Sequence, residues 1–136
     1  MESLVIRSFT NKEDAHELKT EDKQLIESII HCGQSHLSIL GLAGNQTWWA
    51  DTEASALFLD FIRDQTALTE LYLTCNYFSS SVTEQVLSAL LESCGLATLK
   101  EIYLNKSAIF SSDEACYLLA QLLDRAPQLA TCDIRD

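Results

Sequence analysis

Two hydrophobic patterns alternate along this chain at a regular interval. The first is the phrase Leu-x-x-Leu-x-Leu-x-x-Asn, which begins at Leu37 and begins again 31 residues later at Leu68. Variant copies begin at Leu99 and Leu129, and Leu4 with Ile6 fills the two central slots near the N-terminus. Apolar residues at every second position of a short segment are typical of a β-strand with one buried face. The phrase therefore predicts five strands.

The second pattern lies between the phrases and has helical spacing. In each interval, apolar residues stand at i, i+1, i+4 and i+5, which places them along one face of an α-helix. This pattern predicts four helices. Their apolar stripes are Leu25, Ile26, Ile29 and Ile30; Leu57, Phe58, Phe61 and Ile62; Val86, Leu87, Leu90 and Leu91; and Leu118, Leu119, Leu122 and Leu123.

A unit of one strand and one helix cannot bury its own apolar faces, so the units must stack on one another. The repeated phrase resembles leucine-rich repeat proteins, specifically the ribonuclease-inhibitor-like class with long units and outer helices, over nearly the whole chain. The resemblance implies an α/β solenoid, a right-handed βα superhelix with about five parallel strands on its concave face and four helices on its convex face. It implies one domain, 1–136, with units at approximately 1–36, 37–67, 68–98, 99–128 and a partial 129–136.

Candidate capping motifs precede the predicted helices. Ser81 with Glu84 and Ser111 with Glu114 have the Ser-x-x-Glu form of a capping box, in which hydroxyl and carboxylate each accept from a free backbone N–H. One repeat earlier Ala50 stands at the serine position. We expect Asp51 or Thr52 to cap that helix instead, so that it begins one residue later.

The strand residues between the leucines point away from the core, because side chains alternate across a strand. They predict an exposed concave surface, which is where such stacked repeats bind extended partners. Two cross-strand pairs stand out on it, Glu70 with Glu101 and Tyr72 with Tyr103, and tyrosine is a favoured residue of binding hot spots. The alternative is that an aromatic pair stabilises the sheet without binding anything. The candidate protein-binding residues on this surface are Tyr72, Tyr103, Glu70, Glu101, Thr74 and Asn105.

Trp48 and Trp49 are a second candidate for protein binding. One of them is expected to fill the buried position that Phe78 and Ile109 fill in later loops, since a tryptophan gains much by burial. Two adjacent tryptophans do not easily both face inward. The other is therefore expected either to be exposed as an interface anchor or to fold over the loop.

Composition narrows the environment and the partner. The five cysteines are scattered by repeat position, which favours buried thiols in a reducing compartment. With no membrane-length apolar run and no signal peptide, a cytoplasmic location is expected, or the host cytosol if the protein is a secreted effector. A formal net charge of −11 repels nucleic acid and anionic lipid, so we expect neither, and a protein partner with a basic or neutral surface.

No pattern for catalysis, a cofactor or a metal emerges. Cys32 and His36 form the single pairing with ligand-like spacing, but structural zinc sites need four ligands and no second pair lies nearby. The four glycines do not form a phosphate-binding loop. We therefore expect a protein that is not an enzyme.

The working hypothesis is a non-catalytic module, an adaptor, inhibitor or recognition segment, that binds a protein on its concave face. The alternative is a structural subunit that assembles through the open edges of the solenoid and the Trp48–Trp49 loop, including self-association through edge strands. A third hypothesis rests on the resemblance alone. Some similar proteins activate GTPases with an arginine near the sheet edge, and Arg7 is the arginine at a suitable position here.

Overall fold

The computed structural model describes residues 3–7, 24, 27–28, 36–43, 49, 51–73, 79–104 and 112–134. Within them the strands are β1 (Ser3–Arg7), β2 (Ile39–Ala43), β3 (Glu70–Tyr72), β4 (Glu101–Tyr103) and β5 (Thr131–Asp133). They form one parallel sheet in the order β1-β2-β3-β4-β5, so each strand pairs with the next along the chain. The predicted parallel strands are confirmed.

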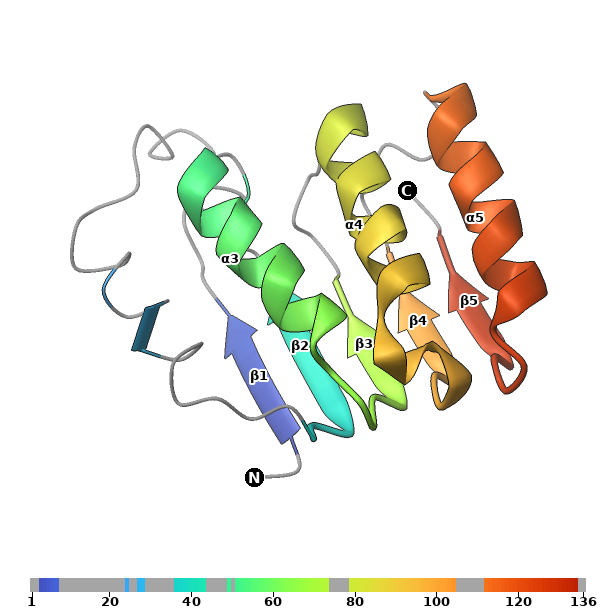
Figure 1. Cartoon of the computed structure of the whole chain (residues 1–136), viewed down its shortest axis with the longest axis horizontal. Helices are drawn as coiled ribbons and strands as arrows, with labels where there is room; N and C mark the ends of the chain where they lie inside the picture. The colour runs from blue at the N-terminus through green and yellow to red at the C-terminus, as the bar shows by residue number, and fades with distance from the viewer. Residues whose placement is uncertain are drawn as a thin grey trace.

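Helices lie along one face of this sheet. They are α3 (Thr52–Arg63), α4 (Ser80–Glu92) and α5 (Asp113–Arg125), and a 3-10 helix, η2 (Cys94–Ala97), follows α4. The three α-helices stand side by side in front of the strands in Figure 1. Of the helix predicted near Leu25, only Gln24, Glu27 and Ser28 are described, and they are helical. The fold is therefore α/β, with a layer of helices over a parallel sheet.

The core lies between these two layers and repeats with the chain. The first leucine of each phrase, at positions Leu37, Leu68 and Leu99, is buried. The next apolar residue of each phrase is also buried and lies in register with its counterparts on the neighbouring strands, as Leu40, Leu71 and Ile102. The helices contribute Phe58, Leu87 and Leu122 to the same cluster. The stripe from Leu25 to Ile30 lies outside the described residues. The other three stripes pack on the core, with Leu57 and Leu91 only partly buried, and one residue needs correction. Leu123 was expected inside, but its side chain is 51% exposed.

Helix caps follow the predicted chemistry but not always the predicted residue. Asp51 caps α3 by accepting from the Ala54 N–H at 3.0 Å, as expected. The prediction of capping boxes was wrong. Ser79 caps α4 in place of Ser81. Ser112 caps α5 in place of Ser111, and Ser111 itself lies outside the described residues. Each of the serines in 79–81 offers a hydroxyl, and the helix extends back to the first of them.

Polar side chains join each return loop to the preceding one. Thr69 Oγ1 donates to the Ser38 carbonyl at 2.9 Å, and in the next return loop Thr98 Oγ1 donates to the Leu68 carbonyl at 2.8 Å. Buried Gln65 accepts from the Leu37 N–H at 3.1 Å and donates to the Phe61 carbonyl at 3.3 Å. These bonds satisfy backbone groups where the chain turns from helix to strand.

We expect Gln65→Ala to lower the free energy of unfolding by about 1–3 kcal/mol, since it removes the acceptor of a buried N–H and leaves a cavity. Urea denaturation followed by circular dichroism measures this change. The matched control is Gln128→Ala, an exposed glutamine that should shift stability by no more than about 0.5 kcal/mol. Equal effects of the two substitutions would refute the bridging role of Gln65.

Candidate functional site

The sheet face opposite the helices carries the predicted pairs in two rows. One row runs Ser3, Ile39, Glu70, Glu101, Thr131, each residue in register with the next. The other runs Val5, Gly41, Tyr72, Tyr103, Asp133. In the part of the chain that the structure describes, no helix covers this face. Glu70, Tyr72, Glu101 and Tyr103 are half-buried on this face.

Tyr72 and Tyr103 stack on each other. Their ring centroids are 4.7 Å apart and their planes differ by 2°. Neighbouring parallel strands hold the two backbones at nearly this distance, so in-register rings come face to face without further support. The stack places two half-buried aromatic rings beside the two glutamates.

Tyr103 also fixes the position of one glutamate. Its hydroxyl donates to Glu101 Oε1 at 2.9 Å. This bond, together with the nearby carboxylate charges and partial burial, raises the pKa of Tyr103 to about 12. The tyrosine is therefore a hydrogen-bond donor at any physiological pH, and it holds Glu101 as an acceptor.

Glu70 and Glu101 behave as a coupled pair of carboxyl groups. A hydrogen bond from Glu70 lowers the pKa of Glu101, and the bond from Tyr103 lowers it further. The same hydrogen bond to Glu101, then partial burial and the Glu101 charge, raise the pKa of Glu70. Two adjacent carboxylates repel when both are ionised, so the pair retains a proton on Glu70 more readily than an isolated glutamate would. A cation placed between them would take over the role of that proton.

The remaining predicted residues separate into two groups. Thr74, Asn105 and Trp48 lie outside the described residues. Trp49 is 3% exposed, and its ring packs against Phe58 with centroids 5.6 Å apart. The packing interpretation is confirmed for Trp49, which is a core residue and does not protrude as a binding anchor.

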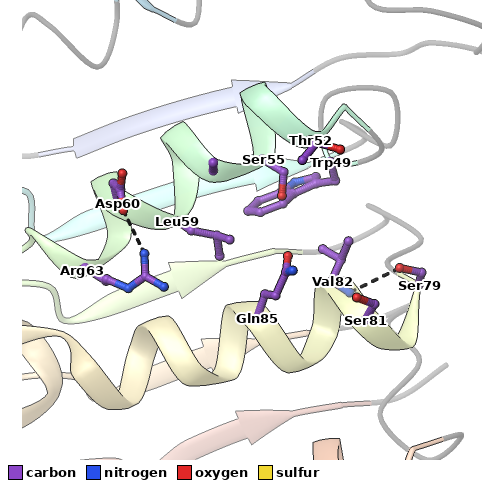
Figure 2. Close-up of a pocket in the computed structure, with 11 residues that line it drawn as sticks. Trp49, Thr52, Ser55, Leu59, Asp60, Arg63, Ser79, Ser81, Val82 and Gln85 are labelled. Atoms are coloured by element: carbon purple, nitrogen blue, oxygen red, sulfur yellow. Dashed lines mark hydrogen bonds and ion pairs between the residues drawn. The ribbon is translucent and has the colours of Figure 1, made fainter.

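A groove between α3 and α4 is a feature that the sequence did not predict. It encloses about 600 Å³, and Trp49, Leu59 and Val82 form its apolar part. Figure 2 shows the indole ring beneath α3, with Gln85 and Val82 of α4 across from it. The small side chains of Ser55, Ala56 and Ser81 leave this space between the helices. The residue pattern of a single helix could not have predicted this groove, because residues from the facing sides of both α3 and α4 line it.

Charges close one end of this groove. Arg63 forms ion pairs with Asp60 and with Glu92 of α4, both at 2.8 Å. Pairs as exposed as these contribute little to stability, but they link the two helices. The groove therefore has an apolar part, a polar lining and a rim of paired charges.

The other sequence candidates gain no support as sites. His36 Nδ1 lies 3.0 Å from Thr66 Oγ1, and Cys32 is outside the described residues. Among the residues that the structure places, no three His, Cys, Asp or Glu side chains gather as metal ligands would. Arg7 ends β1 in register with Ala43.

Comparisons of the chain with protein-family models, with curated proteins and with solved structures found no match. In the described residues, no helix has the length and apolar character needed to cross a membrane.

We expect Tyr103→Phe to raise the pKa of Glu101, because the substitution removes one of the two hydrogen bonds that favour the carboxylate. Titration of the glutamate side-chain carbons by NMR measures this pKa directly. Tyr117→Phe is the matched control, since that tyrosine is exposed on α5. A Glu101 pKa that did not move in Tyr103→Phe would show that the hydroxyl bond is not made in solution.

Proposed function

We propose that this protein is a leucine-rich repeat module of the ribonuclease-inhibitor-like type, which binds a protein partner without catalysis. The observation that carries the proposal is the stacked Tyr72–Tyr103 pair beside Glu70 and Glu101, on a sheet face that no described helix covers. Aromatic residues with few rotatable bonds lose little entropy on binding and anchor many interfaces.

The repeat assignment is supported by the agreement between sequence period and strand register. Leu40 pairs with Leu71 and Leu71 with Ile102, which are the steps of 31 residues in the sequence. Backbone bonds before the strands recur at the same step, since the Thr69 N–H donates to the Ser38 carbonyl and the Lys100 N–H donates to the Thr69 carbonyl. One strand and one helix per step, added in sequence order, is the organisation of a stacked repeat protein.

Charge supports an extended, basic partner. The face carries Glu70, Glu101 and Asp133, and Arg7 ends the edge strand β1. The other lysine and arginines of the described residues lie outside the strands, with Arg63 on α3, Arg125 on α5 and Lys100 before β4. A lysine or arginine beside the tyrosines would gain about 0.5–1 kcal/mol from cation–π attraction at an exposed site. Together with the two carboxylates, this makes a partner segment rich in Lys or Arg the best fit.

We expect an extended peptide that alternates lysine with small apolar residues to bind, and an acidic peptide of the same length not to bind. Replacing both tyrosines, Tyr72→Ala with Tyr103→Ala, should weaken the basic peptide roughly tenfold or more, as loss of a hot spot does. Isothermal titration calorimetry measures both affinities. Tyr117→Ala, on α5, is the control and should leave affinity unchanged.

Loss of the cross-strand pair should cost about 1 kcal/mol or less, so the thermal midpoint of the double variant should fall by no more than about 4 °C. Unaltered peptide affinity in a folded double variant would rule out this face as the binding site.

Binding of the basic peptide should also depend on pH. Because the hydrogen bond to Glu101 raises the pKa of Glu70, this carboxyl holds its proton to a higher pH than an unperturbed glutamate does, and a bound cation must expel that proton. Affinity should therefore fall as pH falls through the pKa of Glu70, by at most about tenfold per pH unit for one proton. Calorimetry across this range should show that Glu70→Gln flattens the dependence, while Glu53→Gln on α3 leaves it in place. A slope that survived Glu70→Gln would place the titrating group elsewhere.

A further inference from the structure

In the helix layer, one arginine neutralises two carboxylates that come from neighbouring units. Arg63 Nη1 donates to Asp60 Oδ1 of the same helix, and Arg63 Nε donates to Glu92 Oε2 of α4, both at 2.8 Å. Different nitrogens of one guanidinium group therefore serve two acceptors. This is possible because the group is planar and carries N–H donors along more than one edge.

The exposed sheet face has a comparable pair of carboxyl groups without such an arginine. Glu70 and Glu101 stand in register on β3 and β4, so they too belong to neighbouring units. Their row continues with Ile39 on one side and Thr131 on the other, both uncharged. Among the described residues, neither this row nor the parallel row through the tyrosines contains a lysine or an arginine.

A proton lies between these carboxyl groups where the helix layer has a cation. Glu70 donates a hydrogen bond to Glu101, which raises the pKa of Glu70 and lowers the pKa of Glu101. Two other charged residues stand near the pair in the sequence or in the rows, exposed Lys100 just before β4 and Asp133 in the tyrosine row. When the shared proton leaves, the two carboxylates repel each other, and an added cation relieves that repulsion.

The oxygen atoms of the pair are not equally available to a partner. Glu101 Oε1 accepts from the Tyr103 hydroxyl at 2.9 Å, so the hydroxyl end of this ring lies at the glutamates. The other oxygen of Glu101 and both oxygens of Glu70 can accept from a partner once the shared proton is lost. These acceptors belong to two carboxylates. A guanidinium group can direct a separate edge to each of them, whereas an ammonium group is a compact point charge.

We propose that an arginine side chain of the partner binds between Glu70 and Glu101, with its guanidinium group donating to both carboxylates. This inference rests on the proposed function, because it names the residue through which a basic partner would bind the exposed sheet face. Binding replaces the shared proton. The O–H bond of the Glu70 carboxyl breaks, the proton passes to solvent, and guanidinium N–H groups donate to the freed oxygens. The contact repeats on the sheet what Arg63 does on the helices.

Three extended peptides that differ at a single basic position test the proposal. One carries arginine there, one lysine and one citrulline, which keeps a planar group with N–H donors but has no charge. Isothermal titration calorimetry with the full chain measures their affinities. We expect the arginine peptide to bind at least about tenfold more tightly than either of the others, because only arginine combines the charge with donors for both carboxylates.

The variant Glu70→Gln should remove most of this preference. Its amide N–H can donate to Glu101 as the shared proton does, but it cannot be expelled, and only one carboxylate remains. The affinities for the arginine and lysine peptides should then agree within a factor of about three. Glu114→Gln on α5 is the matched control, since Glu114 is exposed there, and should preserve the preference. Circular dichroism should show both variants folded.

Release of the shared proton gives a second readout. At a pH near the pKa of Glu70, the binding enthalpy of the arginine peptide should vary with the ionisation enthalpy of the buffer, and in Glu70→Gln this variation should disappear.

The outcomes separate this proposal from the proposed function. Equal affinities for arginine and lysine, both lost in the Tyr72→Ala, Tyr103→Ala double variant, would leave the face as a site for basic peptides and overturn the arginine contact. An arginine preference that survives Glu70→Gln would also overturn it, because the arginine would then bind elsewhere. If none of the peptides bound, the proposed function would fail together with this contact.

Discussion

Stacking of one strand-and-helix unit on the next is the interaction on which this structure depends. Leu40, Leu71 and Ile102 are buried because a neighbouring unit covers each of them, and where no described unit follows, Cys132 is only partly buried. A single unit has too little apolar area to offset the entropy of ordering its chain, so stability accumulates between units. The same contact sets the strand register, and the register places every side chain of the exposed face.

The exposed face shows how such stacking produces a candidate binding surface without additional structure. Strands β3 and β4 each carry one glutamate and one tyrosine at the same strand positions, and the strand spacing brings these residues together. The stacked rings and the coupled carboxyl groups result from this in-register pairing of the two strands. The pKa values of Glu70 and Glu101 shift in opposite directions because the register brings the two carboxyl groups within hydrogen-bonding reach: their shared hydrogen bond raises the pKa of Glu70 and lowers that of Glu101.

Prediction from sequence succeeded where period alone determines the outcome. The register of Leu40 with Leu71 and the Tyr72–Tyr103 stack follow from the step of 31 residues, and the strand order follows from stacking the units in sequence order. Prediction failed where adjacent residues of the same type could each have capped a helix. Ser79 caps α4 in place of Ser81 because several adjacent serines can do so, and only the fit of the helix against the sheet selects one. Leu123 continues the apolar stripe of α5, yet burial also needs a neighbour, and none is described there.

The sequence by itself determined which residues face inward and which positions line up across strands, because alternation and helical period are properties of the local chain. Tertiary structure alone decided the groove beneath α3 and α4, the burial of Trp49 against Phe58 and the exposed flank of α5. Each of these depends on the distance between two elements, which side-chain volumes on both sides set together. No pattern within one segment contains that information.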